Sequence, residues 1–199
     1  YYFYAVAPAN AIAPLQNAPI EVNTNGMNID GLGTINFTNV NGTLDLLYAE
    51  KVVETMTTND PGKVQLQFMH LLSKVQFTFK NAFTNNNATL KVTGLKITDA
   101  PKKAAVAVNK VRTDYAWVIA QGETTTLEFG DVNGGAAFNV GESKESDRAR
   151  LTIPADATRS YTVEFTLELY YGDQLAGTSH KSVSLDNQAL AIGKNYNIV

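Results

Sequence analysis

The fold class that the sequence predicts is all-β, with antiparallel β-sandwiches of transthyretin-like or Greek-key type, and three observations support it. The 199 residues include 19 Asn and 21 Thr; Thr favours pleated strands and Asn favours turns. Several segments alternate apolar and polar side chains with a period of two, as strands with one buried face do. No long segment has a helical period, so sandwiches are expected rather than an α/β fold. A hydrophobic content of 44% excludes a disordered chain.

Three alternating segments carry the strongest strand pattern, and they span residues 64–72, 75–80 and 163–171. Shorter strands are expected at residues 90–98, 115–120, 126–129, 149–153, 181–185 and 195–199. Only residues 15–17 and 44–53 are expected to form short helical turns. The alternation predicts a core for the second half of the chain that contains Phe68, Val75, Phe77, Phe79, Val163, Phe165 and Leu167.

Turn-forming residues separate these strands and indicate where the chain divides. The run of three Asn at residues 85–87 lies between two strong strands and predicts a hairpin loop. The strongest break is the Asn-Asp-Pro-Gly sequence at residues 59–62, which precedes the longest strand pattern. We therefore predict a domain boundary there, with an N-terminal β module in residues 1–60 and a C-terminal β-sandwich in residues 61–199.

Charge and cysteine content exclude several classes of partner and chemistry. The net charge of −3 argues against a protein that holds nucleic acid or acidic lipid by electrostatics. The chain has no Cys, which excludes disulfides, thiolate catalysis and Cys-ligated metal sites. The apolar residues 1–7 are too few for a membrane span and lack the basic flank of a signal peptide. Because the chain begins with Tyr, we expect it to be part of a longer gene product.

No catalytic, cofactor or metal site is expected. Neither His lies near a nucleophile motif, and Ser179 and His180 are strand neighbours that point to opposite faces. His70 shares its parity with apolar residues, so we expect a hydrogen-bonded histidine at the edge of the core. Residues 131–135 begin like a calcium loop but lack the later acidic ligand, so a turn is expected. The mixed charges of residues 142–150 predict a solvated loop.

Trp117 is the only Trp of the chain, and it lies in an apolar segment. A single Trp in such a strand is more often a core residue than a binding residue. It could also provide a platform on which a sugar ring stacks. A glycan-binding β-sandwich at a cell surface therefore stays open as the alternative function.

The sequence VQLQFMHLLSKVQFTF at residues 64–79 resembles the signature of the fimbrillin-like (Mfa-like) proteins of Bacteroidales. Four further segments agree with the family in the same order along the chain. They are YFYAVAP at residues 2–8, DLLYA at 45–49, LTIP at 151–154 and GKNY at 193–196. Each match is weak alone, but together they extend from one end of the chain to the other.

The resemblance implies a non-enzymatic protein at the cell surface, on the extracellular side of the outer membrane. Members of the family are usually lipoproteins, and several are subunits of type V pili or adhesins. The implied fold is two β-sandwich domains of transthyretin-like type. The implied partners are other fimbrial subunits, which join by β-strand exchange, and host or bacterial surface ligands or glycans. Contact with the membrane would occur only through a lipid anchor upstream of this chain.

The family also implies early strands upstream of the segment at residues 2–8. Without them, residues 1–60 are too short for a complete sandwich. We therefore expect the first of the two modules to be incomplete.

Overall fold

The computed structural model describes residues 2–23, 33–53, 63–108, 115–155 and 159–199. Their strands are β1 (Tyr2–Ala7), β2 (Ile20–Asn23), β3 (Gly33–Thr38), β4 (Leu47–Val52), β5 (Met69–His70), β6 (Ser73–Lys80), β7 (Ala88–Pro101), β8 (Lys103–Val108), β9 (Trp117–Ile119), β10 (Thr124–Gly130), β11 (Phe138–Asn139), β12 (Ser143–Glu145), β13 (Arg150–Thr152), β14 (Tyr161–Tyr171), β15 (Gln174–Leu185) and β16 (Asn195–Ile198). Two single 3₁₀ turns, η1 (Ala9–Ala11) and η2 (Asn133–Gly135), complete the secondary structure of these ranges.

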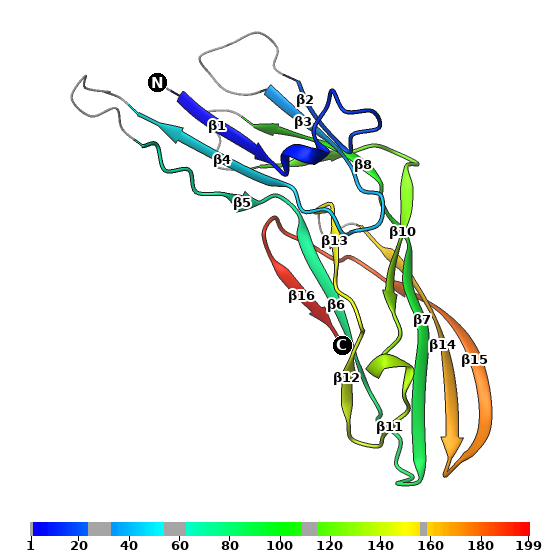
Figure 1. Ribbon diagram of the computed structural model, residues 1–199. Helices are drawn as coiled ribbons and strands as arrows, with labels where there is room; N and C mark the ends of the chain where they lie inside the picture. The colour runs from blue at the N-terminus through cyan, green and yellow to red at the C-terminus, as the bar shows by residue number, and fades with distance from the viewer. Residues whose placement is uncertain (1, 24–32, 54–62, 109–114, 156–158) are drawn as a thin grey trace.

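The first core lies between two sheets at one end of the molecule (Figure 1). One sheet has the strand order β1-β4-β5 and the other the order β2-β3-β8-β9, and every pair in them is antiparallel. The buried residues of the first core are Ala11, Ile20, Ile35, Phe37, Leu46, Tyr48, Leu71, Leu72, Ala104, Val106, Val108 and Ile153.

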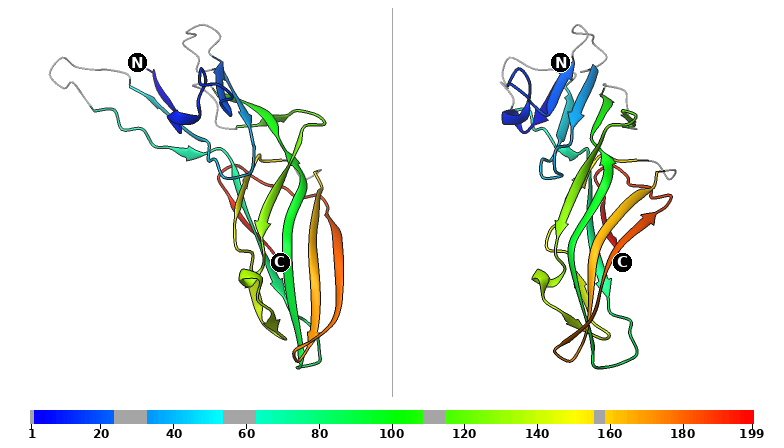
Figure 2. Two further views of the ribbon diagram at one scale, coloured as in Figure 1. Left: turned by 45° about the vertical axis from the view of Figure 1, so that its right-hand side comes forward. Right: turned by 90° about the vertical axis from the view of Figure 1, so that its right-hand side faces the viewer.

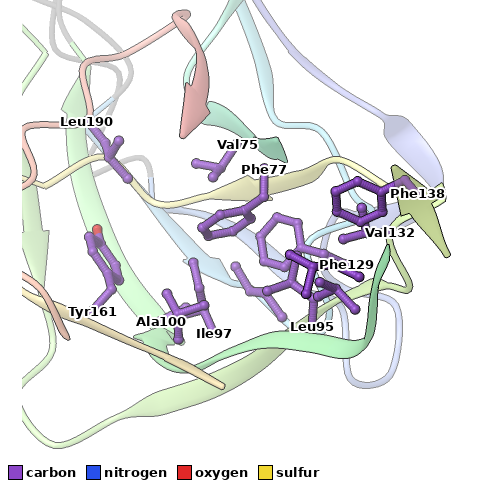
Figure 3. Close-up of a cluster of buried hydrophobic side chains, with 14 residues drawn as sticks. Val75, Phe77, Leu95, Ile97, Ala100, Phe129, Val132, Phe138, Tyr161 and Leu190 are labelled. Atoms are coloured by element: carbon purple, nitrogen blue, oxygen red, sulfur yellow. The ribbon is translucent and has the colours of Figure 1, made fainter. Parts of the chain in front are cut away.

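The second core fills a sandwich at the other end of the molecule (Figure 1), and Figure 3 shows its buried side chains. One layer is the sheet β10-β7-β14-β15, in which the last three strands run side by side (Figure 2). The other layer is centred on β6, which pairs with β12 and β13 on one side and with the parallel strand β16 on the other. The buried residues of the second core are Val75, Phe77, Leu90, Val92, Leu95, Ile97, Ala100, Leu127, Phe129, Val132, Phe138, Tyr161, Val163 and Leu190.

A bulge in β7 allows apolar side chains from both halves of this long strand to face the second core. Leu90 and Val92 are buried with even parity, whereas Leu95 and Ile97 are buried with odd parity. Gly94 lies at the change, with φ of 62°, and its N–H donates to Asp131 Oδ1 at 2.9 Å. A residue with positive φ is most easily Gly, and the extra residue turns the following side chains to the other face.

The two cores meet where β7 passes into β8, and Asn39 ties this junction together. Its backbone N–H donates to the carbonyl oxygen of Lys102, the residue between the two strands, at 2.6 Å. Its side-chain Nδ2 donates to Leu151 O at 3.0 Å, and its Oδ1 accepts from the N–H of Gly42 at 2.8 Å. A Cβ at Gly42 would lie 2.8 Å from Leu151 O, so this loop packs closely only because it carries Gly there.

The expected all-β fold of antiparallel sheets is confirmed, whereas several local predictions are wrong. Residues 47–52 form β4 rather than a helical turn, because β1 and β5 pair with its two edges. Phe68 is 44% exposed rather than part of the core. The alternating segment 64–72 is not one strand: β5 ends at His70, and Leu71 and Leu72 are both buried, which shifts the parity.

The other core predictions agree with the structure to different degrees. Val75, Phe77 and Val163 are buried, as expected. Phe79, Phe165 and Leu167 pack against the second core but are only partly buried.

The predicted boundary at residues 59–62 lies outside the described residues and stays a prediction. The first core draws on residues before and after it, since Phe37 belongs to the same buried cluster as Leu71, Val106 and Ile153. Strands β8 and β9 complete the sheet that β2 and β3 begin. The first module is therefore not built from residues 1–60 alone.

Truncation of Phe77 to Ala tests the second core. Phe77 is 4% exposed, and its ring lies 4.8 Å from that of Phe129 in a T-shaped contact. Phe77→Ala is expected to lower the free energy of unfolding by about 3–5 kcal/mol through loss of burial and formation of a cavity. Phe68→Ala is the matched control and should cost less than about 1 kcal/mol. Urea unfolding measures both; equal losses for the two variants would contradict the assignment of the inner face.

Candidate interaction surfaces

Strand β15 is a long free edge of the second sandwich. It pairs with β14 from Tyr161↔Leu185 to Tyr171↔Gln174, and no described strand pairs with its other side. All of its side chains are exposed except those of Ser179 and Leu185, which are half-buried. A free edge of this length presents a row of unpaired N–H and C=O groups with which another strand can pair.

An incompletely covered part of the second core lies beside this edge. We call it the apolar strip, and it consists of Phe79, Phe165, Leu167, Leu169, Val183 and Ile198. All but Val183 are partly buried, and Val183, which shares the inner face with Val163, is 43% exposed. In the opposite layer, the pairing of β16 with β6 extends to Ile198↔Phe77.

Lys181 is the charged member of the inner face of β15. It pairs with Phe165, so the two side chains point to the same face of the sheet. Charged residues that point inward from an edge strand are a common protection against indiscriminate pairing. A strand that covered the apolar strip would therefore have to meet this ammonium group.

The outer face of the same sheet carries ion pairs across its strands. Lys96 Nζ lies 3.1 Å from Glu164 Oε2, and Lys91 Nζ lies 3.2 Å from Glu168 Oε2. The Tyr170 hydroxyl donates to Glu168 Oε2 at 2.7 Å. The hydrogen bond from Tyr170, and next the one from Lys91, hold the pKa of the Glu168 carboxyl below its ordinary value.

A groove of about 1020 Å³ lies between β9 and the end of the second sandwich. One wall is the segment from Tyr115 to Gln121, which contains β9. The opposite wall is formed by Pro154, Ala155, Arg159, Leu190, Ala191 and Ile192. The groove thus runs beside the free edge of the sheet β2-β3-β8-β9.

Trp117 lies at the periphery of the first core and lines this groove. Its Nε1 donates to Leu71 O at 3.0 Å, and its ring is 6.3 Å from that of Phe37. The core interpretation made from the sequence is therefore correct in part, since the indole is half-buried rather than buried. The stacking role that the sequence left open stays a prediction.

His70 is hydrogen-bonded as predicted, but the prediction that it lies at the edge of the core is wrong. Its Nδ1 lies 2.6 Å from Asp45 Oδ2, and its side chain is 62% exposed. The pair lines an open cleft of about 580 Å³ together with Lys74 and Arg150. The parity shift after β5 that exposes Phe68 also exposes this histidine.

The segment 131–135 forms a turn, as expected, and its carboxylate and that of the neighbouring Asp147 accept hydrogen bonds from backbone N–H groups. Asp131 Oδ1 accepts from Gly94 N, and Asp147 Oδ1 accepts from Gly134 N at 2.8 Å. Residues 142–150 are not simply a solvated loop, because they contain β12 and the buried Ser146, whose Oγ donates to Arg148 O at 3.0 Å. In the ranges that the structure describes, no three His, Cys, Asp or Glu side chains gather as metal ligands.

Two surface features, the full length of β15 and the groove beside Trp117, could not be predicted from the sequence. Only residues 181–185 of β15 were predicted as a strand, because the preceding residues 174–180, apart from Leu175, are small or polar and carry no alternation. Arg159 and Leu190 lie far from Trp117 in sequence, and no local pattern indicates that they share a groove with it.

Comparison with known proteins gives one family and several related structures. The family model described as Fimbrillin-like matches residues 1–198. A fimbrial protein from Bacteroides vulgatus has a similar structure with a TM-score of 0.55 and 14% identity, over 98% of this chain and 72% of that chain. This likeness supports the fold.

Two further structures are candidate cell adhesion proteins. The one from Bacteroides uniformis has a TM-score of 0.39 and 19% identity, over 78% of this chain and 67% of that chain. The one from Bacteroides fragilis has a TM-score of 0.45 and 14% identity, over 82% of this chain and 57% of that chain. None of the curated proteins in the comparison matches the sequence. Within the described part of the chain, no helix combines the length and the apolar character needed to span a bilayer.

The lowered pKa of Glu168 predicts a pH-dependent contribution to stability. The ionised carboxylate stabilises the fold at pH values above the unfolded carboxyl pKa of about 4.3, and this contribution is lost as the pH falls through the lowered folded value. Glu168→Gln should therefore be less stable than the wild type near neutral pH and approach it in acid. Urea unfolding across this range measures the difference. In a Tyr170→Phe background, Glu168→Gln should lower the free energy of unfolding by less. A stability difference between Glu168→Gln and the wild type that is the same at every pH would contradict the prediction.

Proposed function

The chain belongs to the fimbrillin-like family, and from this premise we propose that it is a non-enzymatic fimbrial protein that joins other subunits by β-strand addition. Its family makes it a pilus subunit or adhesin of the cell surface. We place it on the extracellular side of the outer membrane. The observation that carries the proposed mode of assembly is the free edge of β15 beside the apolar strip.

The edge and the strip supply the two parts that strand addition needs. Main-chain hydrogen bonds to a free edge provide affinity, and places for alternate side chains provide specificity. β15 offers 12 residues of backbone, and the apolar strip offers partly buried side chains that an incoming strand would cover. Burial of that apolar surface would favour association by about 25 cal/mol per Å².

The charge of Lys181 adds a condition on the incoming strand. Lys181 lies on the inner face, opposite Phe165, where an added strand would remove it from water. A buried ammonium group needs a partner of opposite charge. We therefore propose that the partner strand carries a carboxylate at the position that faces Lys181.

Both His side chains and that of Asp99 have hydrogen-bond partners within the fold, which supports a non-enzymatic role. His70 pairs with Asp45, and His180 Nδ1 lies 2.9 Å from Thr166 Oγ1. Asp99 accepts from both the N–H and the hydroxyl of Thr162 at 2.8 Å.

A charge placed on the inner face of β15 tests strand addition. Val183→Lys should lower the amount of the full-length protein found in purified surface fibres by about tenfold or more, because it forfeits apolar burial and adds a second cation beside the first. Ser182→Lys is the matched control: it pairs with Glu164 on the outer face and should leave incorporation unchanged. Quantitative immunoblots of fibres from complemented deletion strains measure both.

Two results would count against the proposal at different levels. Equal incorporation of the two lysine variants would reject the β15 edge as the assembly site. Absence of the wild-type protein from fibres, with fibres and adhesion unchanged in the deletion strain, would reject the fimbrial role itself.

A further inference from the structure

We propose that the groove beside β9 binds an oligosaccharide that carries a carboxylate group. The groove has a volume of about 1020 Å³, close to the upper end of the usual range for ligand sites. Its lining combines two aromatic side chains, Tyr115 and Trp117, with the polar side chains of Gln121 and Arg159. Sugars need both kinds of contact, because their rings have apolar C–H faces and a rim of hydroxyl groups.

The two aromatic rings are held in fixed positions from behind. Trp117 Nε1 is bonded to Leu71 O, and the Tyr115 hydroxyl donates to Glu50 Oε1 at 3.4 Å. The Tyr115 ring also packs at 5.9 Å against Tyr48 in a T-shaped contact. Burial, and next the charge of Glu50, raise the pKa of the Tyr115 phenol, so it stays protonated as a donor. Rings fixed in this way lose little freedom when a ligand stacks on them.

The backbone of β9 adds hydrogen-bonding groups to the same wall. Ala120 N donates to Lys103 O at 2.9 Å, so the residues of this parity turn their polar groups toward β8. The N–H and C=O groups of Trp117 and Ile119 therefore point away from β8, and no described group bonds to them. They are available to sugar hydroxyls.

The shortness of β9 favours a sugar over an added polypeptide strand. β9 has 3 residues, whereas the free edge of β15 has 12. An edge with only two outward-facing residues gives too few ladder bonds to hold a strand, but it can bond the hydroxyl groups of one or two sugar units. The groove beside β9 and the edge of β15 thus suit different partners.

The charge of the groove indicates the class of sugar. Among the described residues that line it, Arg159 is the only charged one. Its guanidinium is fixed by a hydrogen bond from Nη2 to Asp99 O at 2.8 Å and by the ring of Tyr161 at 5.4 Å. Within the described residues no carboxylate pairs with Arg159. Arg binds carboxylates through charge-assisted hydrogen bonds, so a uronic acid unit fits this end of the groove.

The test uses Trp117 as a reporter, because it is the only Trp of the chain. The purified chain is titrated with tetragalacturonic acid and with a hyaluronan tetrasaccharide, and cellotetraose and xylotetraose serve as uncharged probes. We expect a saturable change in Trp fluorescence with at least one acidic probe, with a Kd below about 1 mM, and a response at least about tenfold weaker with the uncharged ones. The experiment does not depend on subunit assembly, so its failure would leave the proposed fimbrial role standing.

Variants assign the binding to the groove. Arg159→Gln should weaken binding of the acidic probe about tenfold or more, and Arg159→Lys should restore part of it. Val118→Glu changes a rim residue that is 73% exposed and should also weaken binding by adding a like charge. Arg148→Gln, at an exposed Arg outside the groove, should have no effect. Thermal unfolding of each variant confirms that it folds.

Three results would overturn the proposal. They are no response to either acidic probe, equal binding of the uncharged probes, and binding that Arg159→Gln and Val118→Glu leave unchanged although both fold.

Discussion

The arrangement of the whole molecule depends on how backbone passes between the two cores without leaving its polar groups unpaired. β7 ends at Pro101 and β8 begins at Lys103, so a nearly continuous strand leaves one sheet and enters another. Lys102 lies between them, and both of its backbone groups are bonded: its N–H donates to Glu123 O and its C=O accepts from Asn39 N. Asn39 is 2% exposed, and its amide also binds Leu151 and Gly42. A buried polar network of this kind is stable only when each member has a partner.

This junction also explains why both modules depend on distant parts of the chain. The crossing of β7 into β8 brings Ala104, Val106 and Val108 into the first core. The passage from β5 to β6 places Leu71 and Leu72 in the first core and Val75 in the second. One wall of the groove is β9, which extends the sheet of the first core, and the other contains Leu190 of the second core, so the candidate ligand site lies where the modules meet.

Buried positions that follow a local alternation could be predicted from the sequence. Positions next to a break in the alternation could not. Val75, Phe77 and Val163 follow a strict period of two along single strands, and they are buried as expected. Phe68 and His70 belong to the same apparent alternation, but the chain changes sheets after His70 and the period does not survive the change. The family resemblance could be recognised in the sequence because it rests on short motifs. The groove was not, because Trp117, Arg159 and Leu190 are joined only by tertiary packing.

The continuity of β7 has a mechanical consequence for a protein of surface fibres. β7 is hydrogen-bonded along its length to β14 on one side and to β10 and β11 on the other. In antiparallel pairs these bonds lie perpendicular to the strands. A pull along the long axis of the second sandwich therefore loads many of them at once in shear, rather than opening them one after another as in a zipper. The same strand continues into β8, so tension that enters one module is carried into the next through backbone and not only through side-chain contacts between the two cores.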